Sequence, residues 1–520
     1  MNKIFRPEWT CGRYDDKNRV AIYYNLIEGM AYFFEEESAS VIGEILDVDK
    51  NGILKIQSIS DKIGINTGDL ESFFSLLTKY GLLVTSIPTK ENIKEYRNNV
   101  RLSKQEHVKQ SVKEFQDQSV INSTDAERLY MERVDGFTSA MFELTYRCSE
   151  MCIHCYNPGA TRNDNEINER GNRIELDFND YQRIIDELYE QGLVKVCLSG
   201  GDPFSKPIVW EILEYLYNKG IAIDIFTNGI SVYKYVDRLA DFYPRTIGVS
   251  LYSNIPEVHD SITRVKGSHD KTLRFIKRCS EFGMSMYIKC CIMVPNVKSY
   301  FTVKEVAYTY GALPQFDINI TDSVEGDTCA SSKLRLTHDM MEIVLRDRDL
   351  PYYIGNGMDI SEISSPVDKK GKMCNAGFSS ICITPEGNVQ PCCAFPMMLG
   401  NIRNASIMKI LNNNTVLEWW KGKTLADCTD CHQLPYCVFC QMCAGNNYIA
   451  HGTPLKPSKN NCHIAKERYN LALKMKEGYD PLQGKSLEEK LHELEIILPP
   501  LYRCDSNNYR NIYGVNEMSQ

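Results

Sequence analysis

The hydrophobic residues between positions 137 and 325 show two patterns that alternate along the chain. Short apolar runs typical of buried strands alternate with stretches in which apolar residues recur every three or four positions, as on amphipathic helices. The predicted strands are Ser139–Thr145, Lys195–Ser199, Ala222–Thr227, Thr246–Leu251, Ser285–Met293 and Phe316–Ile320. The predicted helices between them are Tyr181–Gln191, Ile208–Asn218, Tyr235–Phe242 and Lys271–Phe282. Repeated strand–helix units favour an α/β fold with a parallel sheet, and their number suits a partial barrel better than a closed one.

The first 88 residues have the pattern of a small α+β unit. Two β-rich runs, Val20–Leu26 and Met30–Phe34, lie close together and predict a hairpin. The helices predicted after the hairpin are Ser38–Asp47, Ile56–Ile63 and a third with an apolar stripe of Leu70, Phe73, Phe74 and Leu77. A closing Leu-Leu-Val strand at 82–84 would complete a winged-helix-like unit.

The remaining segments differ in polarity. Residues 89–136 are highly charged and poor in large apolar side chains, which predicts a solvated helix or a bridging linker. A cysteine-rich module follows the barrel over 326–465, and residues 466–520 predict a helical tail with its clearest helix at Leu487–Leu498. We expect the last twenty residues to be disordered or loosely docked.

Composition limits the functions that the chain can have. With 520 residues, 43% of them hydrophobic and 24% charged, the sequence suits a globular protein of about three domains. The net charge of −9 argues against a broad nucleic-acid or anionic-membrane surface. No apolar run predicts a signal peptide or a membrane span. Twenty cysteines without a secretion signal predict a cytoplasmic protein that uses them for metal ligation.

Cys148, Cys152 and Cys155 have the spacing C-x3-C-x2-C directly after the first barrel strand. A four-iron cluster normally takes four cysteines, so three on one loop leave one iron free to bind a small molecule. Further candidates lie at the ends of the next strands, where barrel enzymes carry their chemistry. They are Gly200, Gly201 and Asp202, then Thr227 and Asn228, then Ser250, and later Arg264.

This order of motifs resembles the radical SAM enzymes, whose core is a partial (β/α)6 TIM-type barrel. The resemblance implies that the three cysteines hold a 4Fe–4S cluster whose open iron binds S-adenosyl-L-methionine. The Gly-Gly-Asp motif resembles the family's Gly-Gly-Glu-type motif, with Asp202 meeting the amino group of the methionine. Ser250 and Arg264 resemble the pair that holds the ribose or the carboxylate. The chemistry implied is reductive cleavage to a 5′-deoxyadenosyl radical that abstracts hydrogen from an unactivated C–H bond.

Cysteines of the C-terminal module resemble the SPASM extension, which holds two auxiliary 4Fe–4S clusters. Carried over residue by residue, the first set is Cys374, Cys392 and either Cys440 or Cys443, with Cys382 as a possible fourth member. The second set is Cys428, Cys431, Cys437 and Cys462. The family commonly has a cysteine where Gln441 stands, so the choice between Cys440 and Cys443 is open, as is full ligation. Taken alone, the C-x2-C pairs Cys428/Cys431 and Cys437/Cys440 would favour zinc.

The N-terminal unit resembles the PqqD-like domain, which implies that it binds the leader of a precursor peptide as an added strand. A DNA-binding winged helix is the alternative, disfavoured because the third helix lacks a basic face. Most of the chain, apart from the linker and residues 326–373, thus resembles radical SAM/SPASM peptide maturases of the thioether-forming sactisynthase or ranthipeptide-synthase type.

The resemblance implies a ribosomally synthesised precursor peptide as substrate and intramolecular Cys thioethers as product. It also implies a low-potential electron donor such as a flavodoxin or ferredoxin. The alternatives are a carbon–carbon cross-link, oxidation or decarboxylation of a peptide, or a non-catalytic, zinc-stabilised peptide-binding protein. No catalytic general base can be named, although Tyr156, Tyr252 and Asp317 are conceivable pocket residues.

Overall fold

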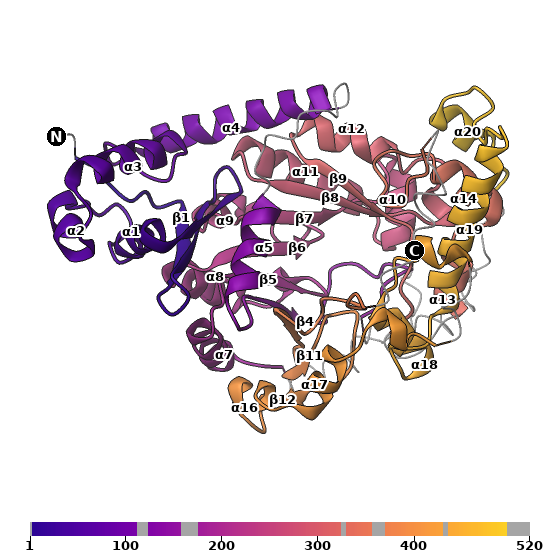
Figure 1. Ribbon diagram of the computed structural model, residues 1–520. Coiled ribbons are helices and arrows are strands. Elements are labelled where there is room, and N and C mark those ends of the chain that lie inside the picture. Colours follow the sequence, from indigo (N-terminus) through magenta and orange to yellow (C-terminus); the bar gives the residue numbers. More distant parts are fainter. Residues whose placement is uncertain are drawn as a thin grey trace.

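A nine-stranded sheet with the order β12-β11-β10-β4-β5-β6-β7-β8-β9 forms the centre of the protein (Figure 1). The computed structural model describes residues 3–111, 123–157, 175–323, 329–355, 370–429 and 435–496. The parallel strands in chain order are β4 Ser139–Thr145, β5 Lys195–Gly200, β6 Ala222–Thr227, β7 Thr246–Ser250, β8 Met286–Cys291 and β9 Leu313–Asp317. The predicted α/β fold with a partial barrel is confirmed.

One barrel strand differs from the sequence prediction by more than two residues at its ends. β9 begins at Leu313 rather than Phe316, because Leu313 and Pro314 pair with Tyr287 and Ile288 of β8. Leu313 is 46% exposed, so the start of this strand carries no buried apolar signal. The predicted end at Ile320 is also too late: Ile318 and Ile320 are buried, but they follow the strand.

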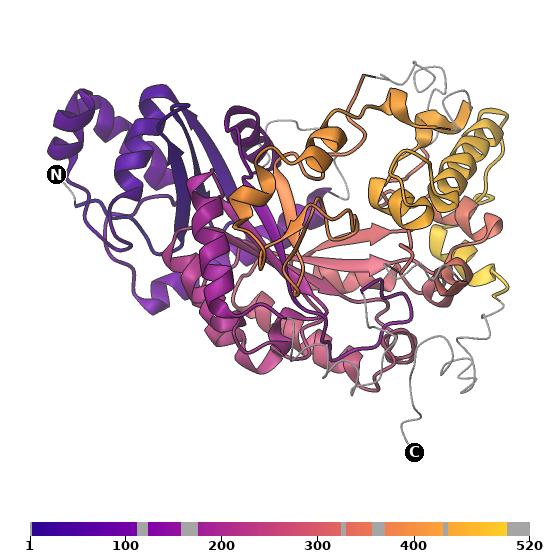
Figure 2. The ribbon, with the colours of Figure 1, turned by 90° about the horizontal axis from the view of Figure 1, so that it is seen from below.

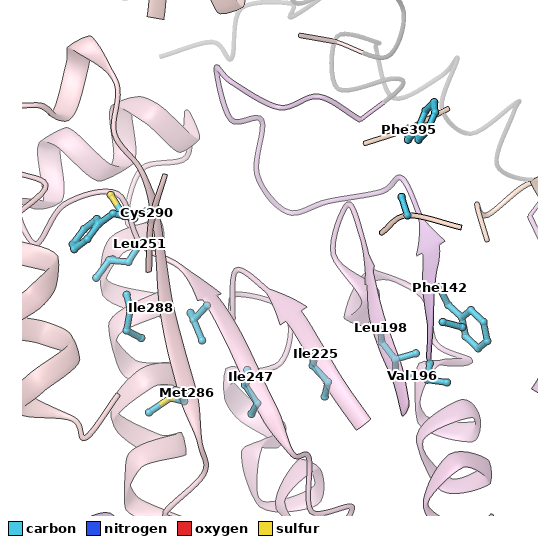
Figure 3. Packing of buried hydrophobic residues seen from close by; sticks show 14 of the residues in the cluster. Phe142, Val196, Leu198, Ile225, Ile247, Leu251, Met286, Ile288, Cys290 and Phe395 are labelled. Carbon is cyan, nitrogen blue, oxygen red and sulfur yellow. The ribbon is translucent and has the colours of Figure 1, made fainter. Parts of the chain in front are cut away.

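Helices cover one face of the parallel sheet. They are α7 Phe178–Glu190, α8 Val209–Asn218, α9 Val236–Ala240, α10 Pro256–Thr263, α11 Ser268–Glu281 and α12 Thr302–Thr309. Alternate strand residues such as Leu198, Ile225 and Ile288 form the core on this face (Figure 3). Because successive strand side chains point to opposite faces, the residues between them lie on the other face. We call it the inner face; it carries Glu143, Cys197, Phe226, Gly248 and Lys289.

The C-terminal module extends the barrel sheet. β10 Ser380–Ile383 pairs in parallel with β4, and β11 Asn388–Gln390 and β12 Gly400–Asn401 continue as antiparallel strands. The helices of this part are α13 Cys329–Leu334, α14 His338–Val344, α16 Ile407–Leu411, α17 Thr415–Lys421, α18 Ala444–His451, α19 Lys459–Lys476 and α20 Leu487–Glu493. The predicted tail helix therefore ends at Glu493 rather than Leu498, and the last twenty residues lie outside the described ones.

The N-terminal unit is a three-stranded antiparallel sheet, β1 Thr10–Asp15, β2 Val20–Asn25 and β3 Met30–Glu35, with three helices. The helices are α1 Glu36–Leu46, α2 Ile56–Ile63 and α3 Thr67–Lys79. The predicted hairpin is present, but the predicted strand at 82–84 is wrong. Val84 makes only an isolated bridge to Phe5, because Leu82 and Leu83 both turn into the core and cannot alternate as strand residues do.

Two helices connect the N-terminal unit to the barrel. α4 Lys90–Ser111 runs along the molecule towards α12, and α5 Ser123–Arg133 packs on β2 and β3 (Figure 1). In α4 the buried Arg97 donates to the carbonyl oxygen of Ala240 at 2.7 Å, so this charged helix bridges two parts of the chain. Figure 2 shows the N-terminal unit and the helices nearest the C-terminus at opposite ends, with the sheet between them. None of the described helices is long and apolar enough to cross a membrane.

Candidate functional site

The loop after β4 carries Cys148, Cys152 and Cys155 and is fastened on two sides by backbone hydrogen bonds. On one side, the amides of Gly201 and Asp202 donate to the carbonyls of Thr145 and Arg147 at 2.7 and 2.9 Å. On the other side, the amides of Met151 and Ile153 donate to the carbonyls of Thr263 and Ile262, at the end of α10, both at 3.0 Å. The three thiols are thereby held at the carboxyl edge of the parallel sheet, the edge where barrel enzymes place their active sites.

Polar groups surround these sulfur atoms. The amide of Glu150 and the side-chain Nδ2 of Asn228 donate to Cys148 Sγ at 3.4 and 3.3 Å, and Tyr252 Oη lies 3.9 Å from Cys152 Sγ as a donor. Such donors stabilise thiolates that bind iron. Burial, above all, raises the pKa of Cys152 and Cys155, while Cys148 is exposed. Iron must displace the thiol protons when it binds.

The donor set fits a four-iron cluster with one open iron. Cys148, Cys152 and Cys155 come from one short loop and act on one another electrostatically. Over the described residues, no three His, Cys, Asp or Glu side chains are grouped closely enough to hold one metal ion. In a cubane cluster each cysteine binds a different iron, so its ligands do not converge on a single point.

Gly200 and Gly201 allow the β5 loop to approach the cysteine loop. A Cβ on Gly200, whose φ is +120°, would lie 2.3 Å from the carbonyl oxygen of Thr145. A Cβ on Gly201 would lie 2.4 Å from that of Arg147. In the structure the nearest neighbours of the two glycines are therefore the carbonyls of the cysteine loop. Only glycine fits here, because any side chain would push the two loops apart.

Asp202 connects the ends of β5 and β6. Its carboxylate is fully buried and accepts hydrogen bonds from Thr227 Oγ1 at 2.6 Å, from the amide of Asn228 at 3.1 Å and from the amide of Phe204 at 3.0 Å. Burial raises its pKa, and these hydrogen bonds oppose the shift. Its observed role is thus to hold two loops of the site together, and its predicted contact with an amino group remains a prediction.

Ser250 and Arg264 lie on the same edge. Ser250 ends β7, and its side chain is near enough to the hydroxyl of Tyr252 to oppose the rise in the pKa of that tyrosine. Arg264 directly follows α10 with φ of 62°, in a loop held by Asp260. Asp260 Oδ1 accepts from Ser268 Oγ and from the amide of His269, both at 2.9 Å. The strand-end residues predicted for S-adenosylmethionine thus lie at the carboxyl edge that also carries the cysteine loop, and Arg264 directly follows Thr263, which contacts that loop.

Two buried residues of this site escaped the sequence analysis. Glu150 Oε2 accepts from Cys152 Sγ at 3.4 Å, and Glu150 Oε1 lies 4.0 Å from Nε2 of His259 in α10. Burial raises the pKa of Glu150 to about 8 and lowers that of His259 to about 3. Glu150 stands at an unspecified position between Cys148 and Cys152, and His259 belongs to no spaced motif, so only the approach of α10 to the loop identifies them.

The C-terminal cysteines form two neighbourhoods. Burial raises the pKa of Cys443, and the nearby Cys374 and Cys393 raise it further, whereas Cys440 lies beside Arg468. Burial also raises the pKa of Cys462, with a further contribution from Cys437. Cys374 and Cys443 belong to the first predicted set, and Cys437 and Cys462 to the second, and both sets stay predictions. The structure places Cys392 next to Cys393, buries Cys428 and Cys382, the latter in β10 near Glu143, and does not describe Cys431.

Comparison with known families identifies two domains. The model of the radical SAM superfamily matches residues 142–301, and that of the SPASM iron–sulfur cluster-binding domain matches residues 374–443. The first covers the cysteine loop and most of the barrel strands. The second begins at Cys374 and ends at Cys443, which are the two cysteines that the structure brings together.

The chain is also similar to curated proteins. It is 27% identical over 334 residues to the subtilosin biosynthesis protein AlbA of Bacillus subtilis, covering 63% of this chain and 71% of AlbA. It is 25% identical to the AdoMet-dependent heme synthase of Methanosarcina barkeri, covering 61% of this chain and 93% of the synthase. It is 30% identical to the mycofactocin maturase MftC of Mycobacterium tuberculosis, covering 33% and 42%. Among solved structures, Streptococcus suis SuiB bound to S-adenosylmethionine aligns with a TM-score of 0.49 and 15% identity, covering 88% and 99%.

Proposed function

The chain is a radical SAM enzyme with an SPASM domain, and we propose that it forms intramolecular thioethers in a ribosomally synthesised precursor peptide. The enzyme uses S-adenosylmethionine, a 4Fe–4S cluster and auxiliary iron–sulfur clusters. Together with the first cluster, S-adenosylmethionine supplies a radical that takes hydrogen from a C–H bond, while the protein orients the substrate and excludes water. Cys148, Cys152 and Cys155 would hold that cluster.

Two of the similar proteins support a peptide-derived substrate. AlbA is named for biosynthesis of the bacteriocin subtilosin, and MftC for maturation of mycofactocin. The heme synthase is similar over a comparable length of this chain. The shared domains therefore define the cofactors, and the substrate has to be argued from features that this chain adds to them.

The observation that carries the proposal is the contact between the two cysteine-containing parts of the protein. Tyr156 follows Cys155 directly, and the thiol of Cys393 in the SPASM domain is near enough to act electrostatically on its hydroxyl and raise its pKa. Cys393 in turn lies 4.0 Å, sulfur to sulfur, from Cys392. Joining a thiol to a carbon removes two hydrogen atoms. The radical takes the first one whole, and the thiol releases the second as a proton. The reaction therefore needs a further acceptor for one electron. Cys374, Cys392 and Cys443 would hold such an acceptor beside the barrel.

The N-terminal unit supplies a surface for the leader of the peptide. Aromatic pairs join β3 to α3: the ring centroids of Phe34 and Phe73 are 5.9 Å apart, and those of Tyr32 and Tyr80 are 5.4 Å apart. Beside them Leu76 is 47% exposed. We propose that this PqqD-like unit binds the leader as a strand added to β3, with main-chain hydrogen bonds providing the affinity. The enzyme would act in the cytoplasm, with a flavodoxin or ferredoxin as electron donor.

Mass spectrometry tests the proposed product. The enzyme, reconstituted without oxygen, is incubated with S-adenosylmethionine, a reductant and the cysteine-containing peptide encoded beside its gene. We expect the peptide to lose two hydrogen atoms and one alkylatable thiol for each cross-link. A peptide with serine in place of the cross-linked cysteine should stay unlinked. Loss of carbon dioxide, or loss of hydrogen with all thiols retained, would contradict thioether formation and indicate decarboxylation or a carbon–carbon bond.

The neighbourhood of Cys374 predicts which of two cysteines binds the first auxiliary cluster. We expect Cys443→Ala to lose about four irons per chain and Cys440→Ala to lose none. The reason is that Cys443 lies beside Cys374, whereas Cys440 lies beside the guanidinium of Arg468. Iron and sulfide analysis of the two reconstituted variants measures the difference. The opposite result would assign the ligand to Cys440.

A further inference from the structure

Lys289 holds a positive charge on the inner face of the barrel. Its Nζ lies 3.5 Å from the centroid of the Phe226 ring, close enough for a cation–π contact. The two residues belong to β8 and β6, so the lysine side chain crosses the strand between them. That strand is β7, and it carries Gly248 where the side chain passes.

Gly248 makes this crossing possible. A Cβ at this position would lie 2.9 Å from Cδ of Lys289 and 2.7 Å from Cδ1 of Phe226. Any side chain here would therefore displace one of the two. The φ of Gly248 is not positive, so backbone geometry does not require glycine at this point of the strand. The glycine is needed for space, and the space holds a lysine against an aromatic ring.

The ammonium has no ion-pair partner among the described residues. Its neighbours Cys197 and Cys291 are thiols whose pKa values burial raises, so they are neutral. Asp317 also acts on Lys289, but its Oδ1 accepts from the amide of Asn319 at 2.7 Å and from Tyr352 Oη at 3.2 Å. Burial lowers the pKa of Lys289. An ammonium removed from water is costly unless an anion compensates it.

Lys289 also lies where the two cysteine sites meet. In the sheet its Cα pairs with that of Ser250, one of the residues predicted to hold S-adenosylmethionine. From the other side Cys393 of the SPASM domain acts on its charge. A substrate placed between the two sites would therefore pass the ammonium, and a negative group on that substrate would compensate the charge of Lys289.

We propose that Lys289, held over Phe226 across Gly248, binds a carboxylate of the peptide substrate and thereby fixes which residue is presented to the radical. The carboxylate is an acidic side chain or the carboxyl terminus of the peptide. The proposal rests on the proposed peptide substrate, but carboxylate binding is measured without any cross-linking. A failure of the cross-linking test would therefore leave this result standing, and the reverse also holds.

Isothermal titration calorimetry of the reconstituted full-length enzyme, saturated with S-adenosylmethionine, tests the site. The probes are N-acetylglutamate amide for an acidic side chain, N-acetylalanine for a carboxyl terminus and N-acetylglutamine amide as the neutral isostere. We expect at least one of the acids to bind about tenfold or more tightly than the neutral amide. Which acid binds more tightly identifies the source of the carboxylate.

Variants assign the preference to this site. Lys289→Met is expected to abolish it, Lys289→Arg to retain most of it, and Gly248→Ala to weaken it while the charge stays. The control is Lys234→Met, because Lys234 also lies over an aromatic ring, 5.7 Å from the centroid of Tyr233, but on the surface. Equal binding of acids and amide, or an unchanged preference in Lys289→Met, would overturn the proposal. So would a loss confined to S-adenosylmethionine affinity, which would assign Lys289 to the carboxylate of that cofactor.

Discussion

Cys152→Ala is expected to abolish cleavage of S-adenosylmethionine and to lower the iron content of the reconstituted enzyme from about twelve to about eight per chain. Cys152 is one of only three thiols on the loop after β4. A four-iron cluster bound by three cysteines already lacks one protein ligand, so two cysteines are too few to retain it. The SPASM cysteines lie elsewhere in the chain and should keep their clusters. Iron and sulfide analysis, with chromatography of 5′-deoxyadenosine, measures both effects.

The matched control is Cys279→Ala. Cys279 is a fully buried thiol in α11, packed in the core on the helical side of the sheet. This variant loses packing, but it should retain all its iron and its cleavage activity. If Cys152→Ala kept about twelve irons, or if both variants lost iron equally, the assignment of the β4 loop as the S-adenosylmethionine cluster site would be wrong.

The barrel could be predicted from the sequence because each of its elements carries a local signal. Val196, Leu198, Ile223 and Ile225 are fully buried or nearly so, and parallel strands of this kind read as apolar runs. The pairing of β10 with β4 gave no such signal. It joins Ser380 to Ser139 across nearly half of the chain, and its short strands could belong to any hairpin of the C-terminal module.

The same distinction applies to the site. The cysteines, the paired glycines and Arg264 were found because their spacing and their place after strands are visible in the chain. The sequence could not show that Asp202 would be fully buried by hydrogen bonds from the β6 loop. It could not show that Glu150 would meet His259, or Lys289 meet Phe226. These contacts depend on how neighbouring strands and loops approach one another.

Phe33→Pro is expected to weaken leader binding about tenfold or more while leaving S-adenosylmethionine cleavage intact. The amide of Glu36 donates to the carbonyl of Arg19, so these two residues form a hydrogen-bonded pair of the β2–β3 ladder. In antiparallel strands such pairs alternate with pairs whose amides point away. Phe33 pairs with Ile22 in the alternate position, so its amide points to the open edge of β3. An added strand would use that amide, and proline removes it.

Phe33→Ala separates the main chain from the side chain. The ring of Phe33 packs against the cluster that contains Ile22 and Tyr130, so either substitution costs packing. Only the proline variant removes the edge donor, because alanine keeps its N–H group. Fluorescence anisotropy with the labelled leader should therefore show a much larger loss for proline than for alanine, with thermal melting as a check on folding. Equal losses would mean that the leader contacts the side chain, and no loss in either variant would place leader recognition outside the edge of β3.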